Sequence, residues 1–125
     1  METLIIDSSE DNPQVILNAR DNILEISGRS LPEDVNTFYE PVLNWIGEYA
    51  RNPAENTVFN FKFTYFNTAS AKVILDILTL FEEMTEEGHS VLVRWHFPDE
   101  DEDMREAGEE YAEMVDVPFE MVCYS

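Results

Sequence analysis

Several residue types that build covalent or catalytic sites are scarce in this chain. It has one cysteine, Cys123, which excludes an internal disulfide; the cysteine lies in an apolar run, where we expect a small buried residue and not a nucleophile. Four glycines leave little material for a glycine-rich nucleotide cradle. No Ser-His-Asp order or nucleophile elbow is present, and neither histidine has a second His or Cys at metal-ligand spacing. We therefore expect no enzyme activity, no metal and no cofactor.

Positive charge and long apolar runs are also scarce. Seven Lys and Arg residues stand against 27 Asp and Glu residues, and the formal net charge of −20 repels nucleic acids and anionic lipid surfaces. No apolar run approaches the roughly 20 residues of a membrane span, and the N-terminus lacks the basic start and apolar stretch of a signal peptide. We expect a cytoplasmic protein whose partners are other proteins, with basic surfaces favoured.

What the chain does have is an alternation of strand and helix patterns. Short strand candidates at 3–6, 15–18 and 23–27 are separated by turn-forming residues and predict an antiparallel meander. Further strands at 57–63, 90–96 and 119–124 alternate with amphipathic helices that begin after Pro32, begin after Thr68, and span about 99–115. We predict one domain, residues 1–125, with an α/β fold: a mixed, mainly parallel sheet of about six strands with about three helices and antiparallel N-terminal strands.

Pro41 interrupts the apolar face of the first predicted helix. Proline removes a backbone donor and clashes with the preceding turn, so either the helix is kinked at Pro41 or it begins near that residue. The sequence leaves both alternatives open.

The most informative segment is the junction between strand and helix at residues 61–72. Alternating phenylalanines end at Phe63, and helical spacing begins after Thr68. Asn67 and Thr68 therefore lie in the cap region, where a side-chain oxygen can accept a hydrogen bond from an unpaired N–H group of the helix. A hydroxyl there either caps the helix or receives a phosphate, because the helix N-terminus and Lys72, one turn further on, both favour an anion. Position alone favours the cap.

Three motifs resemble those of a known family. They are Tyr65-Phe-Asn-Thr-Ala-Ser70 with Lys72 after it, Arg94-Trp95-His96, and Pro118-Phe119. Together they resemble the SiaC family of bacterial regulatory phosphoproteins, which is related in architecture to STAS domains. The resemblance spans nearly the whole chain. Phe66 stands where the family pattern has leucine, and Ala69 stands where it has serine, so residue 69 cannot accept a phosphate.

The resemblance implies a non-catalytic switch protein. It implies that a Ser/Thr kinase phosphorylates Thr68, that a metal-dependent Ser/Thr phosphatase removes the phosphate, and that the unphosphorylated form binds and stimulates a diguanylate cyclase in cyclic di-GMP and biofilm signalling. Ser70 is a weaker alternative phosphoacceptor. Contacts with the phosphate or a partner are expected from Tyr65, Asn67, Ala69, Ser70 and Lys72.

Two other interpretations come from the residues themselves. One is a constitutive acidic binding module in which Thr68 only caps the helix. The other is calcium binding, because the run Asp99–Asp103 together with Glu110 has acids at loop positions one, three, five and twelve. Met104 stands where that loop needs a glycine, and helical spacing follows it, so a solvated acidic helix face is favoured.

Overall fold

The computed structural model describes all 125 residues and contains six strands and three helices. The strands are β1 (Leu4–Ile6), β2 (Gln14–Asn18), β3 (Ile23–Ser30), β4 (Asn56–Phe66), β5 (Ser90–Pro98) and β6 (Phe119–Tyr124), and the helices are α1 (Val35–Tyr49), α2 (Thr68–Glu86) and α3 (Glu102–Met114). This confirms the predicted order of elements. The last helix begins at residue 102 and not near 99, because the carboxylate of Asp101 caps it by accepting a hydrogen bond from the Met104 N–H at 2.9 Å.

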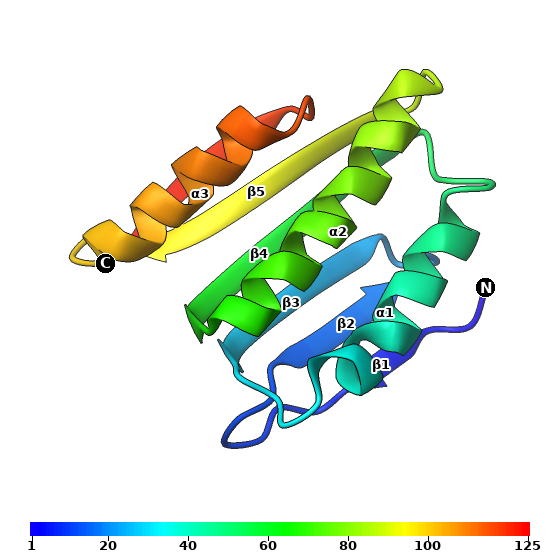
Figure 1. Ribbon diagram of the computed structural model, residues 1–125. Coiled ribbons are helices and arrows are strands. Elements are labelled where there is room, and N and C mark those ends of the chain that lie inside the picture. Colours follow the sequence, from blue (N-terminus) through cyan, green and yellow to red (C-terminus); the bar gives the residue numbers. More distant parts are fainter.

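The six strands lie in the sheet in the same order as in the chain. The β1–β2 and β2–β3 pairs are antiparallel, and the β3–β4, β4–β5 and β5–β6 pairs are parallel, as predicted. Each strand-helix-strand connection advances by one strand in the same direction, so a common handedness places every helix on the same face. Figure 1 shows α1, α2 and α3 on one face of the sheet, whereas the opposite face carries no helix.

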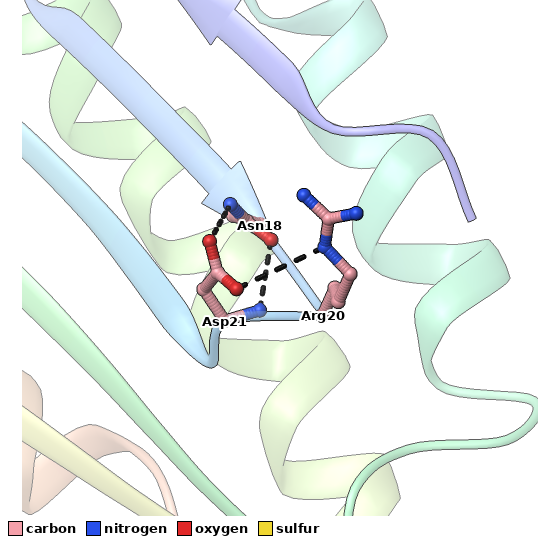
Figure 2. Close-up of polar contacts among 3 residues, drawn as sticks. All are labelled: Asn18, Arg20 and Asp21. Carbon is pink, nitrogen blue, oxygen red and sulfur yellow. Dashed lines mark hydrogen bonds and ion pairs between the residues drawn. The ribbon is translucent and has the colours of Figure 1, made fainter.

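The turn between β2 and β3 is held by short-range polar contacts (Figure 2). The Asn18 amide accepts from the backbone N–H of Asp21 at 2.9 Å and donates to the Asp21 carboxylate at 3.0 Å. Arg20 adds a longer ion pair, 3.8 Å from Nε to Asp21 Oδ1. Asn22 then takes a φ of 61°, a left-handed conformation that asparagine tolerates. The turn predicted between the second and third strand candidates is confirmed.

The first helix begins at Val35 and runs through Pro41. Asp34 caps it, since its carboxylate accepts from the Thr37 N–H at 3.2 Å and from the Thr37 hydroxyl at 2.9 Å. These two hydrogen bonds hold the pKa of Asp34 below its ordinary value. Pro41 leaves the Thr37 carbonyl without its helical donor; both residues are exposed, so water can solvate that carbonyl.

The hydrophobic core lies between the sheet and its helices. At its centre, Phe59, Phe61 and Phe63 of β4 and Trp95 of β5 are completely buried. The Phe61 and Trp95 rings lie 5.5 Å apart between centroids, and Phe59 contacts Phe81 of α2 at 4.9 Å. The predicted alternation in β4 is therefore confirmed as far as Phe63.

Beyond Phe63, β4 contains a bulge that the sequence pattern did not reveal. Gly28 pairs with Phe63 but the next residue, Arg29, pairs with Tyr65, so Thr64 has no partner in β3. The additional residue reverses the alternation: Tyr65 is 46% exposed, whereas Phe66 packs against the ring of Trp95. The strand thus ends at Phe66 and not at residue 63, directly before α2.

The apolar run at residues 119–124 forms β6, as predicted, but Cys123 is exposed, so its prediction as a buried residue is wrong. The reason is that β6 is an edge strand, with a neighbouring strand on one side only.

None of the helices combines the length and the apolar character that crossing a membrane requires.

Candidate functional site

The N-terminus of α2 is capped by Asn67 and not by Thr68. Asn67 is in an extended conformation and its Oδ1 accepts a hydrogen bond from the Ser70 N–H at 2.9 Å. Thr68 is the first residue of the helix and is exposed. The prediction that the Thr68 oxygen caps the helix is therefore wrong, because only the residue before the first helical turn can direct its side chain across the unpaired N–H groups. The Thr68 hydroxyl is available for another role.

Ser70 is completely buried and belongs to a chain of hydroxyl groups. Its Oγ donates to the backbone carbonyl of Ser30 at 2.9 Å and lies 2.9 Å from the Ser30 Oγ, which in turn lies 2.6 Å from the Tyr39 hydroxyl. The prediction that Ser70 contacts a phosphate or a partner is wrong, as is its alternative role as phosphoacceptor. The sequence already indicated that Ser70 is buried, because it precedes Val73 and Ile74 of the apolar helix face by three and four residues.

The same hydroxyl chain predicts a loss of stability in alkali. Burial raises the pKa of Tyr39 to about 12, whereas an unfolded tyrosine titrates near 10. The folded chain therefore keeps a proton that the unfolded chain loses, so this stabilisation is complete below about pH 10 and is lost between about pH 10 and 12. Urea titrations should show the free energy of unfolding falling by up to about 2–3 kcal/mol over that interval.

A Tyr39→Phe variant provides the control for this prediction. Burial also raises the pKa of Tyr111, which is present in both proteins, so only the difference between them reports on Tyr39. An equal fall in both proteins contradicts the assignment.

A largely apolar groove of about 280 Å³ lies between α2 and α3, beside Thr68. It is lined by Phe66, Thr68, Ala71, Lys72, Leu75, Ala107, Glu110, Tyr111 and Met114. The lining residues of α2 follow Thr68 by three, four and seven positions, so they form one stripe of the helix that faces α3. Met114, on the α3 side, is 62% exposed. A second hollow, which shares Phe66 and Ala107, extends the groove towards Tyr65 and Asp103.

Aromatic side chains hold the two walls of this groove together. The ring of Phe66 lies 6.1 Å from that of Trp95 and 6.4 Å from that of Tyr111. The Trp95 indole donates to the Met104 carbonyl at 2.9 Å, and the Tyr111 hydroxyl donates to the Ala71 carbonyl at 2.8 Å. Tyr111 thereby ties α3 to the first turn of α2, the turn that carries Thr68.

Gly108 determines how closely α3 approaches the sheet. A Cβ atom at this position would lie 2.4 Å from Trp95 Cδ1, so only glycine allows the present contact. The helical spacing that follows Met104 includes Gly108, but it did not reveal this role. The sequence did contain an indication of this close packing. Glycine is unfavourable inside a helix, so its presence there indicates that another part of the chain packs closely against it.

The other predicted contact residues are accessible. Ala69 and Lys72 are exposed on the first turns of α2, and Tyr65 is exposed at the end of β4. The Arg29 guanidinium lies 5.5 Å from the centroid of the Tyr65 ring. These residues and Thr68 lie at the carboxyl end of β4, where open α/β sheets commonly bind their ligands.

The Arg94-Trp95-His96 segment does not converge on this site. Only Trp95 faces the helices; Arg94 pairs with Glu120 at 2.8 Å, and His96 Nε2 lies 2.9 Å from the Asn60 amide oxygen. Partial burial, with the nearby charge of Lys62, lowers the pKa of His96. The two polar residues lie on the helix-free face.

The acidic run at residues 99–103 is the start of a helix and not a calcium loop. Asp101 is the cap of α3, and Glu102 and Asp103 occupy its first turn, where the helix dipole favours negative charge. Since the helix continues through Glu110, the four loop positions cannot surround one ion; no group of three or more His, Cys, Asp or Glu side chains converges in the structure. The calcium interpretation is wrong.

An exposed threonine at a helix N-terminus, on the wall of an apolar groove, is an arrangement suited to a regulatory protein-binding domain. The chain belongs to the SiaC family: the family model described as SiaC family regulatory phosphoprotein matches residues 6–124. The chain is also 29% identical over 119 residues to an uncharacterised protein of Pseudomonas aeruginosa, an alignment that covers 95% of this chain and 94% of the relative. The predicted resemblance is confirmed.

Solved structures from Pseudomonas aeruginosa share the fold. Apo-SiaC is 28% identical with a TM-score of 0.89, over 98% of this chain and 99% of that chain. SiaC in complex with the diguanylate cyclase SiaD, of which it is the activator, is 27% identical with a TM-score of 0.92, over 97% of this chain and 99% of that chain. These similarities confirm the predicted mixed sheet with three helices.

Proposed function

We propose that this chain is a non-catalytic regulatory phosphoprotein in which phosphorylation of Thr68 controls binding of a diguanylate cyclase. The observation that carries the proposal is the position of Thr68, exposed at the first residue of α2 and on the wall of the groove between α2 and α3. The family description and the relative that activates a cyclase support the same function.

In this proposal, the groove binds an apolar part of the cyclase while Thr68 is unmodified. Phe66, Leu75 and Met114 supply apolar contact area, and the exposed side chain of Met114 adapts readily to an incoming surface. Tyr65 and Lys72 contact the partner at the edges of the groove. Aromatic and flexible apolar residues at such positions contribute most to binding because they become fully desolvated.

The first turn of α2 has two backbone donors available for a phosphate. Asn67 already occupies the N–H groups of Ser70 and Ala71, the first through its side chain and the second through its carbonyl, both at 2.9 Å. The N–H groups of Thr68 and Ala69 have no helical acceptor. With Lys72 one turn further on, these donors stabilise a phosphate of about −1.5 to −2 charges. The phosphate then places that charge against the apolar wall.

Two partner enzymes in the cytoplasm change the phosphorylation state of Thr68. A Ser/Thr kinase transfers the phosphate to the Thr68 hydroxyl, and a metal-dependent Ser/Thr phosphatase removes it, which links the chain to cyclic di-GMP and biofilm signalling. The net charge of −20 accelerates encounters with basic surfaces of these enzymes.

Mass spectrometry after incubation with the cognate kinase and ATP tests the proposal. We expect a single phosphate on Thr68, none on the buried Ser70, and no incorporation in a Thr68→Ala variant. Thr79→Ala, which removes an exposed hydroxyl further along α2, is the matched control and should be phosphorylated as the parent is. Phosphate on another residue, retained in Thr68→Ala, would sink the proposal.

A further inference from the structure

The helix-free face of the sheet is unusual for its strand arrangement. Strands β3 to β6 are parallel to one another, and sheets built only of parallel strands almost always have both faces covered. All three helices lie on the other face (Figure 1). The parallel part of this mixed sheet therefore has one face without the cover that all-parallel sheets have.

This face carries an apolar stripe, which we define as Ile5, Ile16, Ile23, Val58 and Leu92. Ile5 is directly opposite Ile16, and Val58 is directly opposite Leu92. Ile23 is 46% exposed and Ile5 is 61% exposed, and no member of the stripe belongs to the hydrophobic core. The members come from five neighbouring strands, but Glu25 lies opposite Ile16 and Asn18 lies opposite Ile23, so polar side chains interrupt the apolar surface between β2 and β3.

The charged side chains beside the stripe are balanced. Lys62 pairs with Glu25 at 2.8 Å, and Arg94 pairs with Glu120 at 2.8 Å. These two cations and two anions sum to zero, whereas the whole chain carries a formal charge of −20. The face is therefore locally neutral on a strongly acidic molecule.

We propose that a second copy of this chain covers the helix-free face, in a two-fold dimer with stacked sheets. A two-fold interface needs a surface complementary to itself, and an apolar stripe beside exchangeable ion pairs meets that need. Two chains of charge −20 repel each other wherever acids meet, so a neutral face is where they can come into contact. A basic partner, in contrast, is attracted to acidic surfaces such as α3.

The size of the face indicates a weak, reversible dimer. Six strands spaced about 4.8 Å apart, with an average length of about 20 Å, give about 550 Å² per copy, or about 1,100 Å² in total, near the lower limit of specific interfaces. The groove that contains Thr68 lies on the opposite side of the sheet. The dimer therefore leaves both grooves accessible and does not depend on phosphorylation.

Sedimentation equilibrium from micromolar to near-millimolar protein tests the dimer. We expect the dimer fraction to increase with concentration and to be larger in about 0.5 M than in about 0.05 M NaCl, because salt screens the repulsion between acidic chains. Leu92→Lys and Ile23→Lys each make the chain less negative, which favours association, yet both should be monomeric because they place a charge in the stripe. Thr79→Lys, with the same charge change on exposed α2, should still dimerise.

Circular dichroism establishes that each variant is folded, and the high exposure of Ile23 keeps one variant informative if Leu92→Lys unfolds. A chain that is monomeric at every concentration and salt overturns the proposal, as does a dimer that survives both lysine substitutions in the stripe. If the parent is monomeric and Ile23→Lys weakens cyclase binding in calorimetry, the cyclase covers this face instead, and the proposal is again overturned.

Discussion

Replacing Thr68 by aspartate is expected to weaken binding of the diguanylate cyclase by about 10- to 100-fold, which corresponds to about 1.4 to 2.8 kcal/mol. The carboxylate occupies the first helical position of α2, where the dipole favours it, so the fold should be retained. It also places a charge on the wall of the groove formed by Phe66 and Leu75. An apolar partner segment can then bind only by desolvating that charge, which is costly.

Three control variants separate the effects of charge, shape and position in this experiment. Thr68→Asn has nearly the size and shape of the aspartate variant without its charge, and Thr68→Ser keeps the hydroxyl; both should bind the cyclase as the parent does in isothermal calorimetry. Thr79→Asp adds the same charge at an exposed position of α2 outside the groove lining and should have no effect. Unchanged binding by Thr68→Asp contradicts a switch at this groove. Since Asn67 caps the helix in every variant, capping cannot account for a difference among them.

Replacing Gly108 by alanine is expected to lower the free energy of unfolding by about 3 kcal/mol, a large effect for one added methyl group. The new Cβ would lie 2.4 Å from Trp95 Cδ1, and Trp95 is completely buried with its indole bonded to the Met104 carbonyl. Neither the ring nor α3 can move without breaking that contact. Displacement of α3 also changes the width of the groove, so cyclase binding should decrease as well.

Gly47→Ala is the matched control, because Gly47 also lies inside a helix but has no atom within 4 Å of an added Cβ. Alanine there should be neutral or stabilising by up to about 1 kcal/mol through its higher helix propensity. Urea denaturation of both variants provides the comparison. Similar stability for the two variants means that the contact between α3 and Trp95 is not close-packed, which contradicts the prediction.

At the start of α2, local sequence does not decide which residue caps the helix. Asn67 and Thr68 are both favourable caps, and the modest preference for Asn over Thr does not by itself fix where the helix begins. The choice depends on which residue leaves the extended conformation first, and that is set by the length of β4. The bulge at Thr64 extends this strand to Phe66, and the bulge depends on pairing with β3, more than 30 residues away in the chain.

The sequence by itself determined the order of strands and helices, the acidic character and the family, and it identified Thr68 as the candidate phosphorylation site. These features follow from hydrophobic periodicity, composition and short motifs, which are local properties of the chain. Tertiary structure alone decided that Asn67 caps the helix, that α3 and Gly108 build a groove beside Thr68, and that one face of the mixed sheet has no helix. These depend on how closely distant segments pack, and a contact between Trp95 and α3 has no counterpart in any local pattern.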